Sequence, residues 1–68
     1  MSRFTAYTWQ AGDHWIVQVP EIRHGVTQCV HSTQAHDTAC WFISMMLNIP
    51  AQSFEVDVHV GAPALSAS

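Results

Sequence analysis

Alternating hydrophobic and polar positions predict a hairpin at the start of the chain. Residues 4–10, FTAYTWQ, are rich in β-branched and aromatic side chains, and residues 14–19, HWIVQV, alternate apolar and polar positions. Residues 11–13, Ala-Gly-Asp, have turn chemistry. One face of the second strand collects Trp15, Val17 and Val19, whereas the alternation does not assign a face to Tyr7 or Trp9. Pro20 lacks an amide hydrogen and is expected to end the strand.

The pattern then changes to a helical period and back again. Residues 26–31, VTQCVH, predict a third strand, after which Ser32 or Thr33 can cap a helix that runs to about Leu47. The stripe expected to face the core consists of Ala35, Ala39, Phe42, Ile43 and Met46. Asn48 and Pro50 are expected to stop the helix.

The cleanest alternation belongs to residues 54–60, FEVDVHV. It predicts a half-buried strand with Phe54, Val56, Val58 and Val60 on one face and Glu55, Asp57 and His59 on the other. The predicted fold class is therefore α+β, a β-β-β-α-β unit with a small antiparallel sheet and one helix packed on one face. Residues 1–60 are expected to form a single domain, and residues 61–68, GAPALSAS, a disordered tail.

Composition favours association with other proteins. The chain has 68 residues, of which 49% are hydrophobic and only 10% are charged. A domain of this size buries only about 60% of the surface that its unfolded chain exposes, so we expect a homodimer or higher oligomer. The net charge is −3, and Arg3 and Arg23 are the only basic residues besides histidine. Two arginines cannot form a phosphate-binding patch, so direct nucleic-acid binding is not expected.

Compartment is inferred from what the sequence lacks. Residues 1–10 contain no continuous apolar segment of the kind found in signal peptides. No apolar run approaches the ~20 residues that cross a bilayer. Cys29 and Cys40 alone do not form a disulfide framework. We therefore expect a cytoplasmic protein with reduced thiols and no membrane contact.

Several short segments together resemble one family. The hairpin that ends in W-x-V-x-V-P-E-I, the G-V-T-Q strand, the helix and the final I-P-x-x-x-F-x-V-D-V segment resemble the HicB-like antitoxin domain, in the short form of actinobacteria and their phages that has no DNA-binding segment. The resemblance spans about residues 4–60. The matching positions are Trp15, Val17, Val19, Pro20, Glu21, Ile22, Gly25, Val26, Thr27, Gln28, Ile49, Pro50, Phe54, Val56, Asp57 and Val58.

The resemblance implies a fold and a function. HicB-like domains have a partial RNase H-like fold, a sheet of three or four strands with a helix packed on it. They bind HicA, a small basic mRNA-cleaving toxin, and mask its active site; they also oligomerise and act without catalysis. A separate C-terminal segment of full antitoxins binds operator DNA; residues 1–68 include no such segment, so operator binding is not expected of them. Its helix also carries Gln34, Cys40 and Trp41 where short relatives have Arg and Glu.

Two kinds of chemistry are alternatives to this function. Cys29, His31, His36 and Cys40 offer zinc ligands, but the paired close spacings of structural zinc sites are missing, so no metal or cofactor is predicted. Cys29 and His31 share a strand face at a separation of roughly 6.5 Å and lack a marked oxyanion site, so no catalytic residue is predicted. Glu55 and Asp57 are interpreted as the solvated face of the last strand and not as catalytic carboxylates.

The remaining candidates are partner-binding residues. On a helical wheel Trp41 lies about 140° from the centre of the core stripe, and Met45 lies on the same side as Trp41, with Thr38 and Gln34. One helix on one sheet buries one stripe, so these side chains should stay exposed as a protein-binding surface. Glu21, Glu55 and Asp57 are expected to meet basic residues of a HicA-like toxin. The alternative is a stand-alone oligomeric regulatory or structural protein, encoded by a phage or its host, that binds another host protein.

Overall fold

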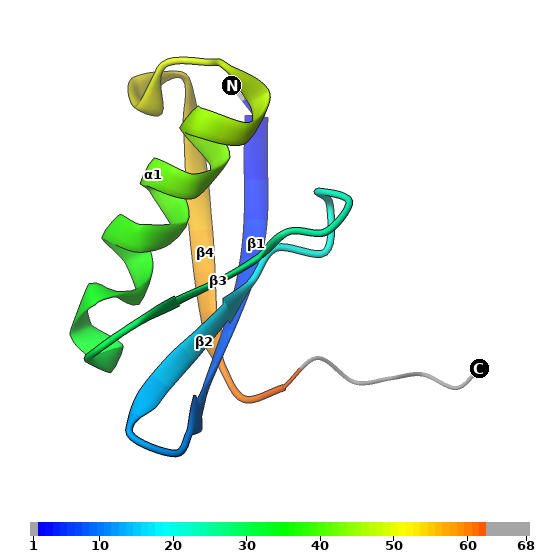
Figure 1. The fold of residues 1–68 in the computed structure, drawn as a ribbon. Helices are drawn as coiled ribbons and strands as arrows, with labels where there is room; N and C mark the ends of the chain where they lie inside the picture. Colours follow the sequence, from blue (N-terminus) through cyan, green and yellow to red (C-terminus); the bar gives the residue numbers. More distant parts are fainter. Residues whose placement is uncertain (1, 63–68) are drawn as a thin grey trace.

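The structure is a computed structural model, and it describes residues 2–62. One helix lies against one face of a four-stranded sheet (Figure 1). The elements in chain order are β1 (Ser2–Ala11), β2 (His14–Gln18), β3 (Val26–Cys29), α1 (Ala35–Leu47) and β4 (Phe54–Val60), with 3-10 turns over Ser32–Gln34 and Ala51–Ser53. The predicted order β-β-β-α-β and the α+β class are confirmed. No helix within residues 2–62 has the length and apolar character needed to span a membrane.

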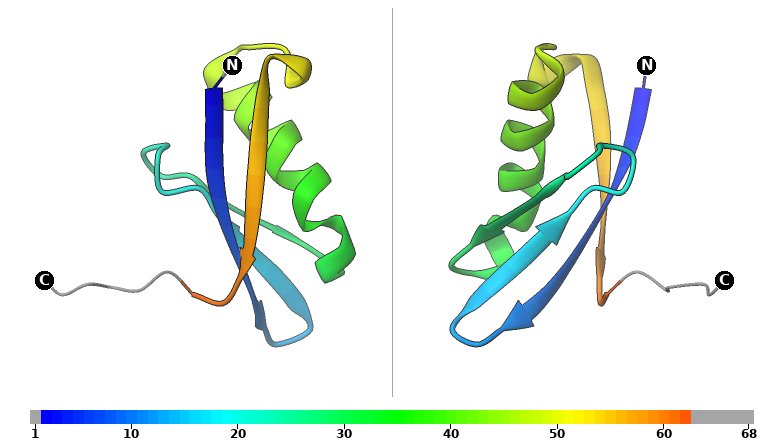
Figure 2. Two further views of the ribbon diagram at one scale, coloured as in Figure 1. Left: turned by 180° about the vertical axis from the view of Figure 1, so that it is seen from behind. Right: turned by 45° about the vertical axis from the view of Figure 1, so that its right-hand side comes forward.

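The sheet is mixed, so the prediction of an antiparallel sheet was wrong. Its order is β3-β2-β1-β4, with β1–β2 and β2–β3 antiparallel and β1–β4 parallel. After β3 the chain returns along α1 and enters the far edge of the sheet beside β1 (Figure 2). A helical connection brings the chain back to the end where it started, and the next strand therefore runs parallel. The two-residue period of β4 carries no information on this direction.

The core lies between α1 and the face of the sheet that the helix covers. Its fully buried residues include Val17, Val19, Ala39 and Ile43, while Phe4 and Phe54 meet edge to face with ring centroids 5.5 Å apart. Ala6 and Thr8 of β1 are also buried. By the period of two, Tyr7 and Trp9 therefore lie on the uncovered face, which answers the question that the sequence left open.

The N-terminal end of α1 differs from the prediction, and its C-terminal end agrees with it. Ser32 and Thr33 lie in a 3-10 turn and do not cap the helix; the Gln34 side-chain oxygen instead accepts the backbone N–H groups of Val30 and His31 at 3.2 and 3.3 Å. Asn48 ends the helix as predicted. It adopts the left-handed conformation with φ 56° and ψ 48°, and its N–H bonds the carbonyl of Ser44.

Two residues that were expected to face the core are exposed. Met46 is 46% exposed although it belongs to the helix stripe that was predicted to face the core. Val60 is 77% exposed although it continues the apolar face of β4. Near the C-terminal end of α1, β2 and β3 diverge from the helix (Figure 1), so Met46 has less sheet beneath it. Val60 is the last residue of β4, on the edge strand. Of the predicted tail, residues 63–68 lie outside the described residues.

The position of α1 predicts unequal costs for two truncations in the same stripe. Ile43→Ala removes a fully buried side chain and should lower the free energy of unfolding by about 3 kcal/mol. Met46→Ala truncates a half-exposed side chain and should cost less than about 1 kcal/mol. Urea denaturation followed by circular dichroism measures both. Equal losses at the two positions would contradict this placement of the helix.

Candidate functional site

The most exposed large apolar side chains of the helix lie beside β3. Trp41 is 58% and Met45 53% exposed, as predicted, and Thr38 lies one turn before Trp41 on the same side. Thr38 and Trp41 line an open hollow of about 470 Å³ together with Cys29 and Val30. We call Val30, Thr38, Trp41 and Met45 the Trp41 surface. Asp37 is the only charged residue in the lining of the hollow.

Strand geometry explains why the Trp41 surface is uncovered. β3 is the edge strand on this side and has only four residues. β2 and β3 also run obliquely to α1, as Figure 1 shows, so within residues 2–62 no further layer lies beside this part of the helix. Trp41 cannot turn inward, because Phe42 and Ile43 already occupy the stripe that packs on the sheet.

Glu55 and Asp57 are engaged within the chain. The Arg3 guanidinium contacts the Glu55 carboxylate at 2.7 Å and the Asp57 carboxylate at 3.3 Å, on the sheet face that α1 does not cover. The hydrogen bond to Glu55, followed by the charges of Asp57 and Glu55, raises the pKa of Arg3. One arginine and two carboxylates sum to a charge of −1. These side chains remain about half exposed, so a basic partner could reach them, but it would meet a partly neutralised cluster.

Glu21 has a structural contact in the loop between β2 and β3. Its carboxylate accepts the backbone N–H of Thr5 at 3.1 Å, where β1 extends beyond the end of β2. The same loop buries Ile22 and closes through Val19 N–H to the Gly25 carbonyl at 2.7 Å. A Cβ on Gly25 would lie 2.5 Å from the Val19 carbonyl oxygen, so only glycine fits there.

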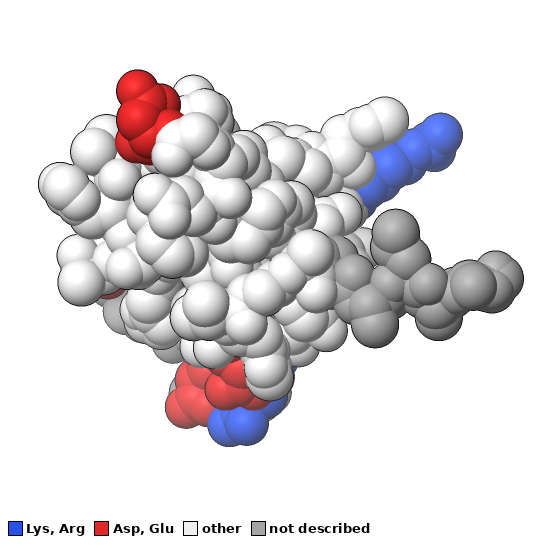
Figure 3. Space-filling model, turned by 90° about the horizontal axis from the view of Figure 1, so that it is seen from below, with Lys and Arg blue, Asp and Glu red and all other residues white. Residues whose placement is uncertain are grey.

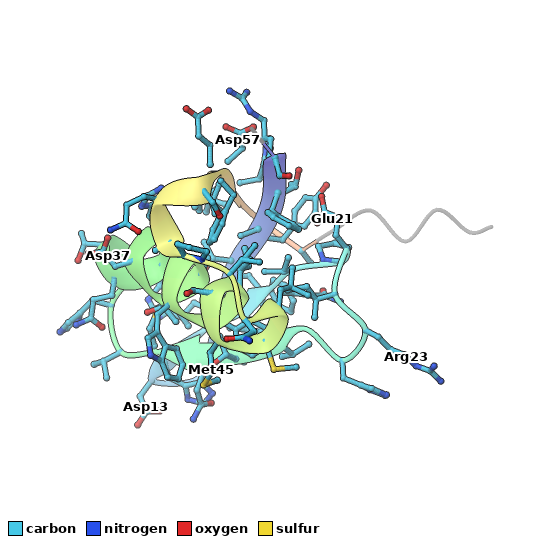
Figure 4. The ribbon with its side chains drawn as sticks, turned by 90° about the horizontal axis from the view of Figure 1, so that it is seen from above. Asp13, Glu21, Arg23, Asp37, Met45 and Asp57 are labelled. Atoms are coloured by element: carbon cyan, nitrogen blue, oxygen red, sulfur yellow. The ribbon has the colours of Figure 1, made fainter. Side chains whose placement is uncertain are left out.

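The six predicted partner-binding residues do not form one surface. Figure 4, a view down onto the helix, places Asp57 and Met45 on opposite sides of the molecule, with Glu21 in the loop at a third position. Thr38, Trp41 and Met45 belong together on the β3 side, and Glu55 and Asp57 belong with Arg3 on the uncovered sheet face. Figure 3 shows a broad uncharged surface between the few charged side chains.

The uncovered sheet face holds aromatic residues that the sequence analysis did not place. Tyr7 of β1 stacks on His59 of β4, with ring centroids 5.5 Å apart and an interplanar angle of 30°. Trp9 pairs with Ile16 across β1 and β2. The sequence held one indication of this face. Ala6 is small enough to fit beneath a helix, so its neighbour Tyr7 would be expected on the opposite face of the sheet. The contact with His59 depends on the parallel register and leaves no trace in either segment.

The four candidate metal ligands do not converge. The Cys40 sulfur lies 3.9 Å from both ring nitrogens of His36, while the Cys29 thiol donates to the His31 backbone carbonyl at 3.2 Å. Among residues 2–62 no three His, Cys, Asp or Glu side chains are grouped closely enough to hold a metal ion. Burial, and secondarily the charge of Asp37, raises the pKa of the Cys40 thiol. A catalytic cysteine needs the opposite shift.

Comparison of this protein with known protein families, with curated proteins and with solved structures finds no match.

The environment of Cys40 predicts the pH dependence of its alkylation. Because the thiolate is the reactive form, the rate of alkylation by iodoacetamide should rise with pH. The pH at the midpoint of this rise should be higher than for the same cysteine in the urea-unfolded chain, where it is about 8.5. Asp37→Asn should lower the midpoint without abolishing the difference, because burial is the larger cause. Peptide mass spectrometry resolves Cys40 from Cys29. A midpoint at or below that of the unfolded chain would overturn this assignment.

Proposed function

We propose that this protein is a non-catalytic, protein-binding module of the HicB-like kind, which masks a small basic HicA-like mRNA-cleaving toxin. The observation that carries the proposal is the Trp41 surface, where an exposed tryptophan and methionine lie beside a hollow on a nearly uncharged part of the molecule. Tryptophan is enriched among the residues that dominate binding energy, and methionine among interface residues generally.

The fold supports the kinship on which the toxin assignment rests. One helix on one face of a small sheet, in the order β-β-β-α-β, agrees with what the resemblance implies. The residues of the V-P-E-I-x-x-G segment also have identifiable roles in this chain. Val19 and Ile22 fill the core, Glu21 holds the free N–H of Thr5, and Gly25 permits a close backbone approach. These roles serve packing whatever the partner is, so they support the predicted fold more directly than they support a toxin as the target.

In this proposal, contact and attraction come from different parts of the surface. The Trp41 surface supplies the apolar contact that holds the complex. The net charge of −3 and the exposed carboxylates of Glu55 and Asp57 favour the approach of a basic protein. Since Arg3 neutralises part of that cluster, the complex should depend only weakly on ionic strength compared with one held by unpaired carboxylates.

The proposal is tested by identifying the partner. The tagged protein is used for affinity capture from the native lysate, and the captured proteins are identified by mass spectrometry. A small basic protein encoded in the adjacent reading frame, which arrests growth when expressed alone and is relieved by co-expression of this chain, supports the antitoxin function. Specific capture of an unrelated host protein, with no such neighbour, contradicts it and favours the stand-alone regulatory module.

Substitution of Trp41 should abolish partner binding without unfolding the protein. Trp41→Glu places a charge at the centre of the proposed contact and should weaken binding by at least about thirtyfold, the effect of losing one dominant interface side chain. Leu47→Glu is the matched control, because Leu47 is 42% exposed on the same helix and lies roughly 120° around it from Trp41. Isothermal titration calorimetry measures both. Unchanged affinity of the Trp41→Glu variant would remove the basis of the proposal.

A further inference from the structure

We propose that the outer edge of β4 is a self-association site at which a second copy of this chain adds its own β4 antiparallel, making one continuous sheet across a two-fold axis. This inference goes beyond the proposed function and uses a different part of the surface. It begins from the sheet order, which leaves β4 as the longer of the two edge strands, with seven residues against four in β3. In the rear view of Figure 2, β4 lies beside β1, and within residues 2–62 no strand pairs with its other edge.

The backbone of β4 presents a regular set of unused hydrogen-bonding groups. Gly61 donates its N–H to the Thr8 carbonyl at 2.7 Å, so Gly61 faces β1. Because successive residues of a strand face opposite sides, His59, Asp57 and Glu55 also direct their N–H and C=O groups toward β1. The outward-facing groups therefore belong to Val56, Val58 and Val60. No lysine or proline, the usual protection of a free edge, occurs in β4.

Among the antiparallel registers that pair at least five residues of β4, charge favours one. If two copies meet with Val58 opposite Val58, each Asp57 lies opposite His59 of the other copy on the uncovered sheet face. The imidazole can then donate a hydrogen bond to the carboxylate. If the two-fold axis passed through Asp57, each Asp57 carboxylate would lie opposite Asp57 of the other copy. If the axis passed through Val56, each Asp57 would lie opposite Glu55 of the other copy. Both alternatives oppose like charges directly, which destabilises a sheet. Arg3 keeps its contacts with Glu55 and Asp57 in the selected register.

The same register covers the exposed end of β4 on the helix side. Val60 of one copy lies opposite Val56 of the other, next to a hollow of about 380 Å³ between α1 and β4. His36 and Cys40 of the helix and Phe54 and Val56 of the strand contribute to its lining. Val60, 77% exposed in the single chain, thus gains an apolar neighbour from the second copy. The outward-facing backbone groups permit this arrangement, the charges favour it over the two alternatives, and it also gives Val60 an apolar neighbour.

The oligomeric state of the full chain tests the proposal. In sedimentation equilibrium at neutral pH the protein should be a dimer, and Val60→Lys should raise the dimer dissociation constant by at least about tenfold, because a lysine at an edge opposes strand addition. Val30→Lys is the matched control: Val30 is 62% exposed but belongs to the Trp41 surface. A monomeric wild type, or a dimer broken by Val30→Lys and not by Val60→Lys, overturns the proposal.

Oxidative crosslinking tests the register independently of affinity. Val58→Cys should form a disulfide across the axis, since hydrogen-bonded antiparallel pairs place their Cα atoms about 5.5 Å apart. The wild type, which contains Cys29 and Cys40, is the control for other crosslinks. Crosslinking of Asp57→Cys in place of Val58→Cys would overturn the register. A monomeric Val60→Lys variant that still binds the partner through Trp41 separates this site from the proposed function.

Discussion

The structure depends on one constraint: a single helix can cover only one face of the four-stranded sheet. Ile43, Ala39 and Phe42 fill the contact with Val17, Val19 and Phe54, and this layer contains most of the buried apolar surface of a small domain. Everything outside it stays accessible. The Trp41 surface beside β3, the aromatic residues of the uncovered face and the free edge of β4 all follow because residues 2–62 form two layers and no third.

The crossover from β3 to β4 decides how these surfaces are distributed. Because the chain returns along α1, β4 enters beside β1 and becomes an edge. Arg3, near the start of β1, then meets Glu55 and Asp57, more than fifty positions away in sequence. The acidic side chains of Glu55 and Asp57 thus belong to the uncovered face of the sheet. Trp41 and Met45 lie on the other side of the molecule, on the helix (Figure 4). A partner bound at one of these surfaces leaves the other available.

A low density of charge has different effects at different places. Near Trp41 the only charged residue in the lining of the hollow is Asp37, so few charged groups have to be desolvated on contact. Along β4 the few charged groups determine which register two copies can adopt, because each like-charge pair is penalised. At Cys40, burial and secondarily the charge of Asp37 raise the pKa of the thiol. In a chain with only 10% charged residues, the location of each charge therefore affects binding surfaces and strand pairing as well as solubility.

Local periods were sufficient to predict the number, type and order of the elements, the core stripe from Ala35 to Ile43 and the exposure of Trp41 and Met45, because these depend on neighbouring side chains along one element. The direction of β4, the exposure of Met46 and Val60, and the pairing of Arg3 with two carboxylates could not be predicted in this way. They depend on which strand lies beside which and how far the sheet extends beneath the helix. Those relations arise only when distant segments pack, so they belong to the tertiary structure alone.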